Sequence, residues 1–122
     1  MKKPLALIIE DDLSSAKLYQ RLFRIAGYKS RLCTTYDQAK KELEEIVPDL
    51  VVLDMRLEHY DYGPELLKYI KANDEFCDTR IVMITAYSKM ADEYGDQADL
   101  VILKPVNARN LLLIAEDFQS VN

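Results

Sequence analysis

The sequence predicts an α/β fold: a doubly wound five-stranded parallel sheet with helices on both faces. Two observations support this prediction. Short apolar runs without polar alternation recur along the chain, as expected for strands that are buried on both faces of a sheet. Between the runs, apolar residues recur at steps of three and four, which is the period of an amphipathic helix. Right-handed crossovers between such alternating elements give one layered domain.

Five strands are predicted. Four apolar runs fit strands that are covered on both faces, and they span residues 5–9, 50–53, 81–84 and 100–103. A fifth candidate, residues 29–33, contains Lys29, Ser30 and Arg31. Charged and polar side chains suit a strand with a more exposed setting, so we expect this strand at the edge of the sheet.

Five helices are predicted between and after the strands. The first has an apolar stripe that stops at Gly27, formed by Ala16, Tyr19, Leu22, Phe23 and Ala26. Thr35 and Gln38 have the spacing of a capping box for the second helix, which ends before Pro48.

The remaining helices are recognised from their first turns and their apolar spacing. Pro64 suits the first turn of the third helix, and Asn107 can cap the last one. A fourth helix, near residues 88–94, is short. At 122 residues the chain is long enough for one core and too short for two, so residues 1–122 are expected to form a single domain.

Composition and charge exclude several classes of protein. The chain is 49% hydrophobic and 30% charged, which is typical of a globular domain. Its net charge of -5 and pI near 4.9 argue against direct binding to nucleic acid. The first apolar run ends at once in Glu10, Asp11 and Asp12, so it is expected to be a strand, and neither a signal peptide nor a membrane anchor. Two free thiols, Cys33 and Cys77, suit a reducing cytoplasm.

Polar residues follow the predicted strands at the points where those strands end. Glu10, Asp11 and Asp12 follow the first strand, and Asp54 ends the third. Thr85 and the pair Lys104-Pro105 follow the last two. Because ligands of doubly wound sheets bind at the carboxyl ends of the strands, we expect these residues to converge on one site.

The chemistry of these residues points to a metal-assisted phosphoryl acceptor. Carboxylates gathered at one sheet edge repel each other, and a hard cation with oxygen ligands, Mg2+ above all, relieves that repulsion. Mg2+ usually takes one or two carboxylates together with a phosphoryl oxygen, which leaves Asp54 free to attack phosphorus. Thr85 and Lys104 would then contact the phosphoryl oxygens.

The ordered set Glu10-Asp11, Asp54, Thr85-Ala86 and Lys104-Pro105 resembles the CheY-like receiver domain of two-component response regulators, and the resemblance covers essentially the whole chain. It implies the flavodoxin-like strand order 2-1-3-4-5. It also implies that Asp54 is the phosphoacceptor and a metal ligand, that Asp11 binds Mg2+ directly, and that Glu10 helps through water. The backbone carbonyl of Arg56 would be a further ligand, and a cis bond before Pro105 would aim Lys104 into the site.

The same resemblance implies the partners and the activity. A sensor histidine kinase or a histidine phosphotransfer protein would supply the phosphoryl group, and a further, unidentified protein would receive the signal. Any enzymatic activity would be limited to self-phosphorylation and autodephosphorylation at the aspartate.

Several positions depart from the family pattern. Glu58 stands where the family usually carries a proline, and Tyr62 looks like an insertion. The spacing from Thr85 to Lys104 is short, and the loss falls on the fourth helix. Val101 replaces the aromatic residue that the fifth strand usually carries, so a switch through that aromatic is not expected. His59, without a second nitrogen or sulfur ligand, is expected at the loop surface.

Three other functions compete with phosphoryl acceptance. A degenerate receiver that binds a partner without phosphorylation is favoured by the altered loop and Val101 and opposed by the intact acidic site. An aspartyl-phosphate phosphatase needs an acid where Arg56 stands, and a flavin carrier needs a Ser/Thr/Gly-rich loop where Glu10 to Asp12 stand. Tyr60, Tyr62, Tyr87 and Tyr94 could form a recognition patch or pack over the core and the site rim.

Overall fold

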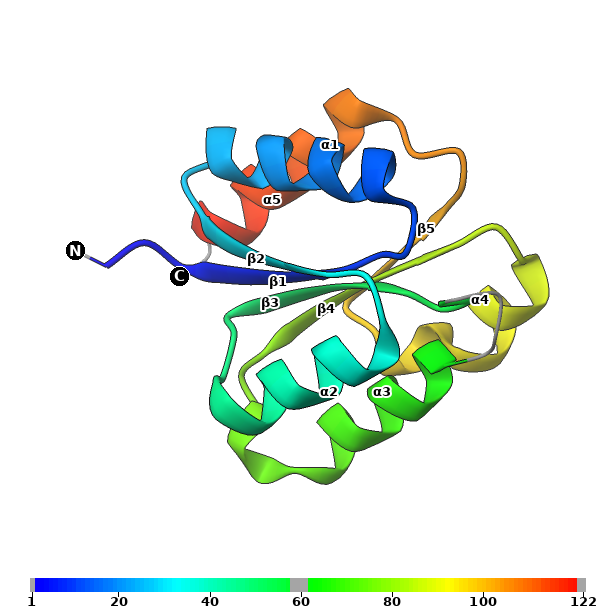
Figure 1. The fold of residues 1–122 in the computed structure, drawn as a ribbon. Helices are drawn as coiled ribbons and strands as arrows, with labels where there is room; N and C mark the ends of the chain where they lie inside the picture. Colours follow the sequence, from blue (N-terminus) through cyan, green and yellow to red (C-terminus); the bar gives the residue numbers. More distant parts are fainter. Residues whose placement is uncertain (1, 58–61, 121–122) are drawn as a thin grey trace.

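The computed structural model describes residues 2–57 and 62–120 and shows alternating strands and helices (Figure 1). The strands are β1 (Leu5–Ile9), β2 (Lys29–Cys33), β3 (Leu50–Asp54), β4 (Arg80–Thr85) and β5 (Leu100–Leu103). The α-helices are α1 (Leu13–Ile25), α2 (Tyr36–Glu45), α3 (Tyr62–Ala72), α4 (Ser88–Tyr94) and α5 (Ala108–Ser120). Two single 3₁₀ turns that the sequence did not predict, Asp74–Phe76 and Gly95–Gln97, follow α3 and α4.

The five strands form one parallel sheet in the order β2-β1-β3-β4-β5, which confirms the predicted fold class. The chain moves outward from β1 to β2, returns to β3 on the other side of β1, and then continues through β4 to β5. The strand order therefore reverses between β1 and β3. Crevices at such reversals are where doubly wound sheets bind their ligands.

Successive strand residues face opposite layers of helices, as the pleat requires. In β1, Leu7 and Ile9 join the core beneath α2 and α3, whereas Ala6 and Ile8 join the core beneath α1 and α5. Figure 1 shows α1 and α5 on one face of the sheet and α2, α3 and α4 on the other. Because the central strands are buried on both sides, their ends are fixed in place and can hold polar groups precisely.

Side-chain caps hold the starts of three helices, and two of them, Thr35 and Asn107, are the residues predicted as caps. Asp12 accepts a hydrogen bond from the Ser15 N–H (3.1 Å) at the start of α1. Thr35 accepts one from the Gln38 N–H (3.1 Å), and Gln38 reaches back to the Thr34 N–H (2.9 Å). Asn107 accepts one from the Asn110 N–H (3.0 Å) at α5. Each cap satisfies a backbone donor that the first turn leaves unpaired. Asp12 thus serves as a cap.

The burial of β5 corrects one expectation. The apolar run at residues 100–103 predicts a strand covered on both faces, but β5 is the second edge of the sheet. Its side chains are half-buried, and Leu103 is 51% exposed. An apolar run indicates that a strand packs against helices. The position of the strand in the sheet depends instead on which other strands pair with it. β2, in contrast, lies at an edge as predicted.

The expectations for Glu58, His59 and Tyr60 concern residues outside those that the structure describes. Cys33 is buried, Cys77 is exposed, and the two are not bonded to each other, as expected. Across residues 2–57 and 62–120, no helix has the length and apolar character needed to cross a membrane.

Candidate functional site

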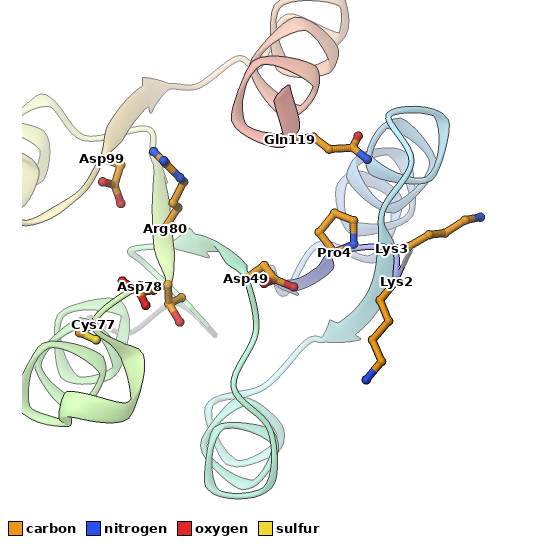
Figure 2. A pocket seen from close by; sticks show the side chains of 10 residues that line it. Lys2, Lys3, Pro4, Asp49, Cys77, Asp78, Arg80, Asp99 and Gln119 are labelled. Carbon is orange, nitrogen blue, oxygen red and sulfur yellow. The ribbon is translucent and has the colours of Figure 1, made fainter. Parts of the chain in front are cut away.

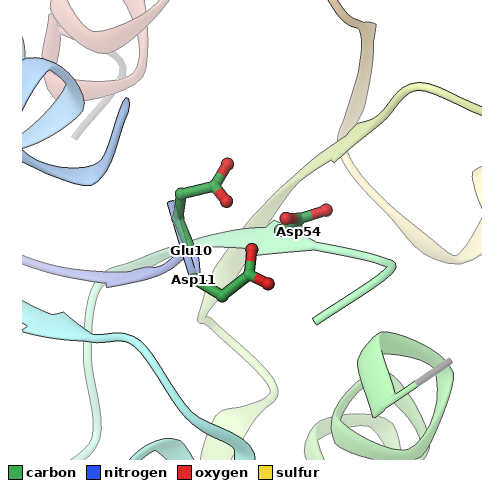
Figure 3. Close-up of side chains that lie close together, drawn as sticks. All are labelled: Glu10, Asp11 and Asp54. Carbon is green, nitrogen blue, oxygen red and sulfur yellow. The ribbon is translucent and has the colours of Figure 1, made fainter. Parts of the chain in front are cut away.

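Three carboxylates gather at the carboxyl ends of β1 and β3, where the strand order reverses (Figure 3). Glu10 and Asp11 directly follow β1, and Asp54 is the last residue of β3. One oxygen of each carboxylate lies within 4.8 Å of one oxygen of the other two. We call Glu10, Asp11 and Asp54 the acidic cluster. The sequence had predicted this convergence from the strand ends alone.

Glu10 is the most deeply buried member of the acidic cluster, with 1% of its surface exposed. Its Oε2 accepts a hydrogen bond from the Asp12 N–H (3.1 Å), which fixes the side chain against the start of α1. Burial, followed by the neighbouring Asp54 carboxylate, raises the pKa of Glu10 to about 8, although the Asp12 N–H and Lys104 act in the opposite direction. The site therefore holds more negative charge than burial favours.

Lys104 supplies the compensating positive charge in the structure. Its Nζ lies 3.0 Å from Glu10 Oε1 and 3.3 Å from Asp54 Oδ2, so one ammonium joins the ends of β1, β3 and β5. These two carboxylates raise the pKa of Lys104 to about 12 in spite of its partial burial. The Lys104–Pro105 peptide bond is cis, as the family resemblance implied. The pairing of Lys104 with Glu10 was not predicted.

Thr85 lies at the end of β4 with its hydroxyl fully buried. Its Oγ1 accepts a hydrogen bond from the Tyr87 N–H (3.0 Å). Among residues 2–57 and 62–120, the acceptor of its own proton is a weak one, the Met90 Sδ at 3.9 Å. The backbone of β5 adjoins it, because the Lys104 N–H donates to the Thr85 carbonyl (2.8 Å). The hydroxyl proton is thus available to a better acceptor.

Arg56 follows Asp54 by two residues and contributes through both backbone and side chain. Its N–H donates to Asp54 Oδ1 (3.2 Å), which orients the carboxylate. Its exposed side chain reaches the loop after β4, where Nη1 donates to the Tyr87 hydroxyl (2.8 Å) and the guanidinium lies 5.0 Å from the centre of the Tyr87 ring. The sequence indicated a side chain near the site but not its contact with Tyr87.

Gly63, in the first turn of α3, brings the start of this helix into contact with Met55, the residue after Asp54. The Gly63 N–H donates to the Met55 carbonyl (3.1 Å), and a Cβ on Gly63 would lie only 2.3 Å from the Met55 Cα. A side chain is therefore excluded by backbone that cannot move without displacing Asp54. The sequence had flagged this loop as altered, and the glycine is the feature that it retains.

A hollow of about 800 Å3 lies at the opposite, amino-terminal end of the sheet (Figure 2). Its charged lining is mixed, with Lys2, Lys3 and Arg80 beside Asp49, Asp78 and Asp99. Two of these carboxylates have a structural task. Asp49 accepts from the Leu5 N–H and Asp99 from the Ile81 N–H, both at 2.7 Å, so they satisfy strand starts.

Comparison with known proteins agrees with this geometry. The family model of the response regulator receiver domain matches residues 6–116. The transcriptional regulatory protein ZraR of Escherichia coli K12 is 36% identical over 108 residues, which are 86% of this chain and 24% of ZraR. The chain therefore spans about a quarter of that relative's length. The polar-differentiation response regulator DivK of Brucella anthropi is 29% identical over 71% of this chain and 70% of DivK.

Solved structures show the same fold. The chemotaxis response regulator CheY4 of Vibrio cholerae superposes with a TM-score of 0.84 at 19% identity, covering 96% of this chain and 99% of that one. A receiver domain from Methylobacillus flagellatus gives 0.82 at 20% identity with the same coverage. At such identities the likeness concerns the fold, and the family model extends it to the sequence. The chain belongs to the response regulator receiver domain family of two-component systems.

Proposed function

We propose that Asp54 accepts a phosphoryl group beside a Mg2+ ion and that the modified domain passes a signal to another protein. The observation that supports this most directly is the acidic cluster with the Lys104 ammonium between Glu10 and Asp54. Asp54 ends a strand whose side chains are otherwise apolar, and a carboxylate there without a task would carry a desolvation cost.

The donor set fits Mg2+. Three carboxylates offer oxygen ligands at one point, and hard cations of this kind prefer oxygen. Asp11 and Asp54 would bind the ion directly, Glu10 would act through water, and the Arg56 carbonyl would complete the protein ligands. Bound Mg2+ would neutralise the charge that develops on the phosphoryl oxygens.

The positions of the side chains support one transfer step. An Asp54 carboxylate oxygen attacks the phosphorus of a phosphohistidine, the phosphorus–nitrogen bond breaks, and the electron pair remains on the imidazole nitrogen, which takes up a proton. Lys104 would move from Asp54 to the phosphoryl oxygens, because a dianion is the stronger partner. Thr85 would donate its hydroxyl proton to the same group.

The donor is expected to be a sensor histidine kinase or a histidine phosphotransfer protein, and the receiving protein is unidentified. We expect no direct binding to nucleic acid, since the net charge is -5. A reducing, cytoplasmic location is proposed because Cys33 and Cys77 are free thiols.

Intact mass after incubation with acetyl phosphate and Mg2+ tests the proposal without a protein partner. One covalent phosphoryl adduct per chain is expected, and it should be lost when Mg2+ is removed with a chelator. A chain that stays unmodified, and that also stays unmodified with a phosphorylated histidine phosphotransfer protein, would be a degenerate receiver that binds without phosphorylation.

Asp11→Asn should weaken Mg2+ binding about tenfold or more, because it removes one anionic ligand from a small site of hard donors. Mg2+ titrations followed by NMR shifts of the Asp54 and Arg56 amides measure the affinity. Asp37→Asn, an exposed position in the first turn of α2, is the matched control and should bind Mg2+ as the wild type does. Equal affinities for Asp11→Asn and the wild type would remove Asp11 from the ligand set.

A further inference from the structure

Arg56 and Tyr87 form a bridge between the two loops that leave β3 and β4. The Arg56 Nη1 donates to the Tyr87 hydroxyl at 2.8 Å, and the guanidinium stacks over the ring at 5.0 Å. Both side chains are exposed, and Tyr87 is 44% exposed although it is an aromatic residue. We call this pair the loop bridge. A hydrogen bond and a cation–π contact together give it a preferred geometry even at the surface.

Each end of the loop bridge is attached to the proposed reaction site by its own backbone. The Arg56 N–H donates to Asp54 Oδ1 (3.2 Å), and the Tyr87 N–H donates to Thr85 Oγ1 (3.0 Å). The two loops leave neighbouring strands in register, since Asp54 pairs with Ile84. The Arg56 end of the bridge is therefore bonded to Asp54, and the Tyr87 end to Thr85.

We propose that Arg56 exchanges partners, pairing with Tyr87 while Asp54 is unmodified and with the phosphoryl oxygens once Asp54 is phosphorylated. This inference rests on the proposed function. The Arg56 N–H already lies 3.2 Å from Asp54 Oδ1, so the start of the arginine side chain is within reach of a group carried by that carboxylate. A phenol oxygen is a neutral acceptor, whereas a phosphoryl group is a dianion that accepts two parallel bonds from a guanidinium.

Release of Tyr87 gives the exchange a structural consequence. Tyr87 is the N-cap residue of α4, and its side chain makes no capping hydrogen bond there. Its side chain is held by Arg56, and its backbone by Thr85. When Arg56 turns to the phosphoryl group, residues 87–94 lose the restraint on the Tyr87 side chain, and a movement of Thr85 toward the same group displaces the Tyr87 backbone that is bonded to it. The loop bridge thus stabilises the unphosphorylated arrangement, and phosphorylation removes that stabilisation.

Two substitutions separate the roles of the loop bridge, because they are expected to change affinity in opposite directions. Tyr87→Phe removes the phenol oxygen and its hydrogen bond but keeps the ring, so Arg56 is held less tightly. Beryllofluoride with Mg2+, a mimic of the phosphoryl group, should then bind about two- to fivefold more tightly. Arg56→Gln removes the partner of the phosphoryl group, so binding should weaken by about threefold or more. Arg56→Lys keeps the charge and should lie between Arg56→Gln and the wild type.

Affinity is measured by titrating the magnesium-loaded protein with beryllofluoride. The titration is followed through two NMR signals, the backbone amide of residue 87 and the ε-methyl of Met90, which lies beside Thr85. In Tyr87→Phe without beryllofluoride, both signals should already be shifted toward their bound positions. Arg31→Gln is the matched control, since Arg31 is an exposed arginine paired with Glu42 on another part of the surface.

The outcomes distinguish this inference from the function on which it rests. If the wild type binds beryllofluoride but Tyr87→Phe and Arg56→Gln change the affinity in the same direction, or not at all, the partner exchange is wrong and phosphoryl acceptance stands. If the wild type neither binds beryllofluoride nor forms a phosphoryl adduct, both fall together.

Discussion

Asp54→Asn should abolish the covalent phosphoryl adduct while the fold persists. The amide has nearly the volume of the carboxylate but is not a nucleophile toward phosphorus. Asp54 also lies beside Glu10, and their proximity raises the pKa of Glu10. Loss of the Asp54 charge removes that repulsion and also the ion pair with Lys104, but Lys104 keeps Glu10 as a partner at 3.0 Å, so the free energy of unfolding should stay the same or rise. The Asp54 carboxylate is thus expected to contribute nothing to the free energy of unfolding, or to lower it, although the proposed function requires it.

Intact mass with acetyl phosphate and Mg2+ gives the first readout, and urea unfolding followed by circular dichroism gives the second. Asp37→Asn serves as the control for both, and it should form the adduct at the wild-type level. An adduct of undiminished yield in Asp54→Asn would assign the phosphoryl group to another residue. A large fall in stability would instead mean that the Asp54 charge supports the fold.

Lys104→Ala should abolish the conformational response to phosphorylation and make the stability of the domain dependent on Mg2+. Without the ammonium, Glu10 and Asp54 lose the cation that lies 3.0 Å and 3.3 Å from them. Removing one partner of a buried ion pair is strongly destabilising, but Lys104 keeps 29% of its side chain exposed, so we expect a loss of only about 1–3 kcal/mol without metal. Mg2+ should restore part of this loss, because its charge lies among the same carboxylates.

Urea unfolding with and without Mg2+ measures the stability, and NMR spectra with and without beryllofluoride measure the response. Lys41→Ala, which removes an exposed lysine on α2, is the control for both. In Lys104→Ala the adduct should still form, since the nucleophile and the metal ligands remain. Wild-type beryllofluoride shifts in residues 87–94 of Lys104→Ala would exclude Lys104 from the response.

The sequence predicts most of the fold because buried strands and helices can be recognised from the apolar residues and caps in their own segments. The central strands β1, β3 and β4 are apolar except at the terminal residues Asp54, Arg80 and Thr85, and side chains that can be recognised beforehand cap α1, α2 and α5. The acidic cluster is predictable for a related reason. Its members stand at strand ends, and parallel strands bring those ends to one edge.

Contacts between distant loops could not be predicted in this way. Arg56 and Tyr87 are separated by 31 positions, and no sequence pattern around either residue identifies the other as its partner. The sequence could assign Lys104 to the site but could not pair it with Glu10. Which of several nearby carboxylates the ammonium contacts depends on small differences in distance that only the structure shows. The edge position of β5 likewise depends on pairing and not on its own residues.

The contact between Gly63 and Met55 bears on how this family can vary. The Gly63 N–H on the Met55 carbonyl closes the connecting segment on itself directly after Asp54. A segment between two fixed ends can gain or lose residues at modest cost, because the entropy of closing a loop grows only slowly with its length. Insertions and deletions between Met55 and Gly63 should therefore change the stability of this domain little, as long as Gly63 is kept.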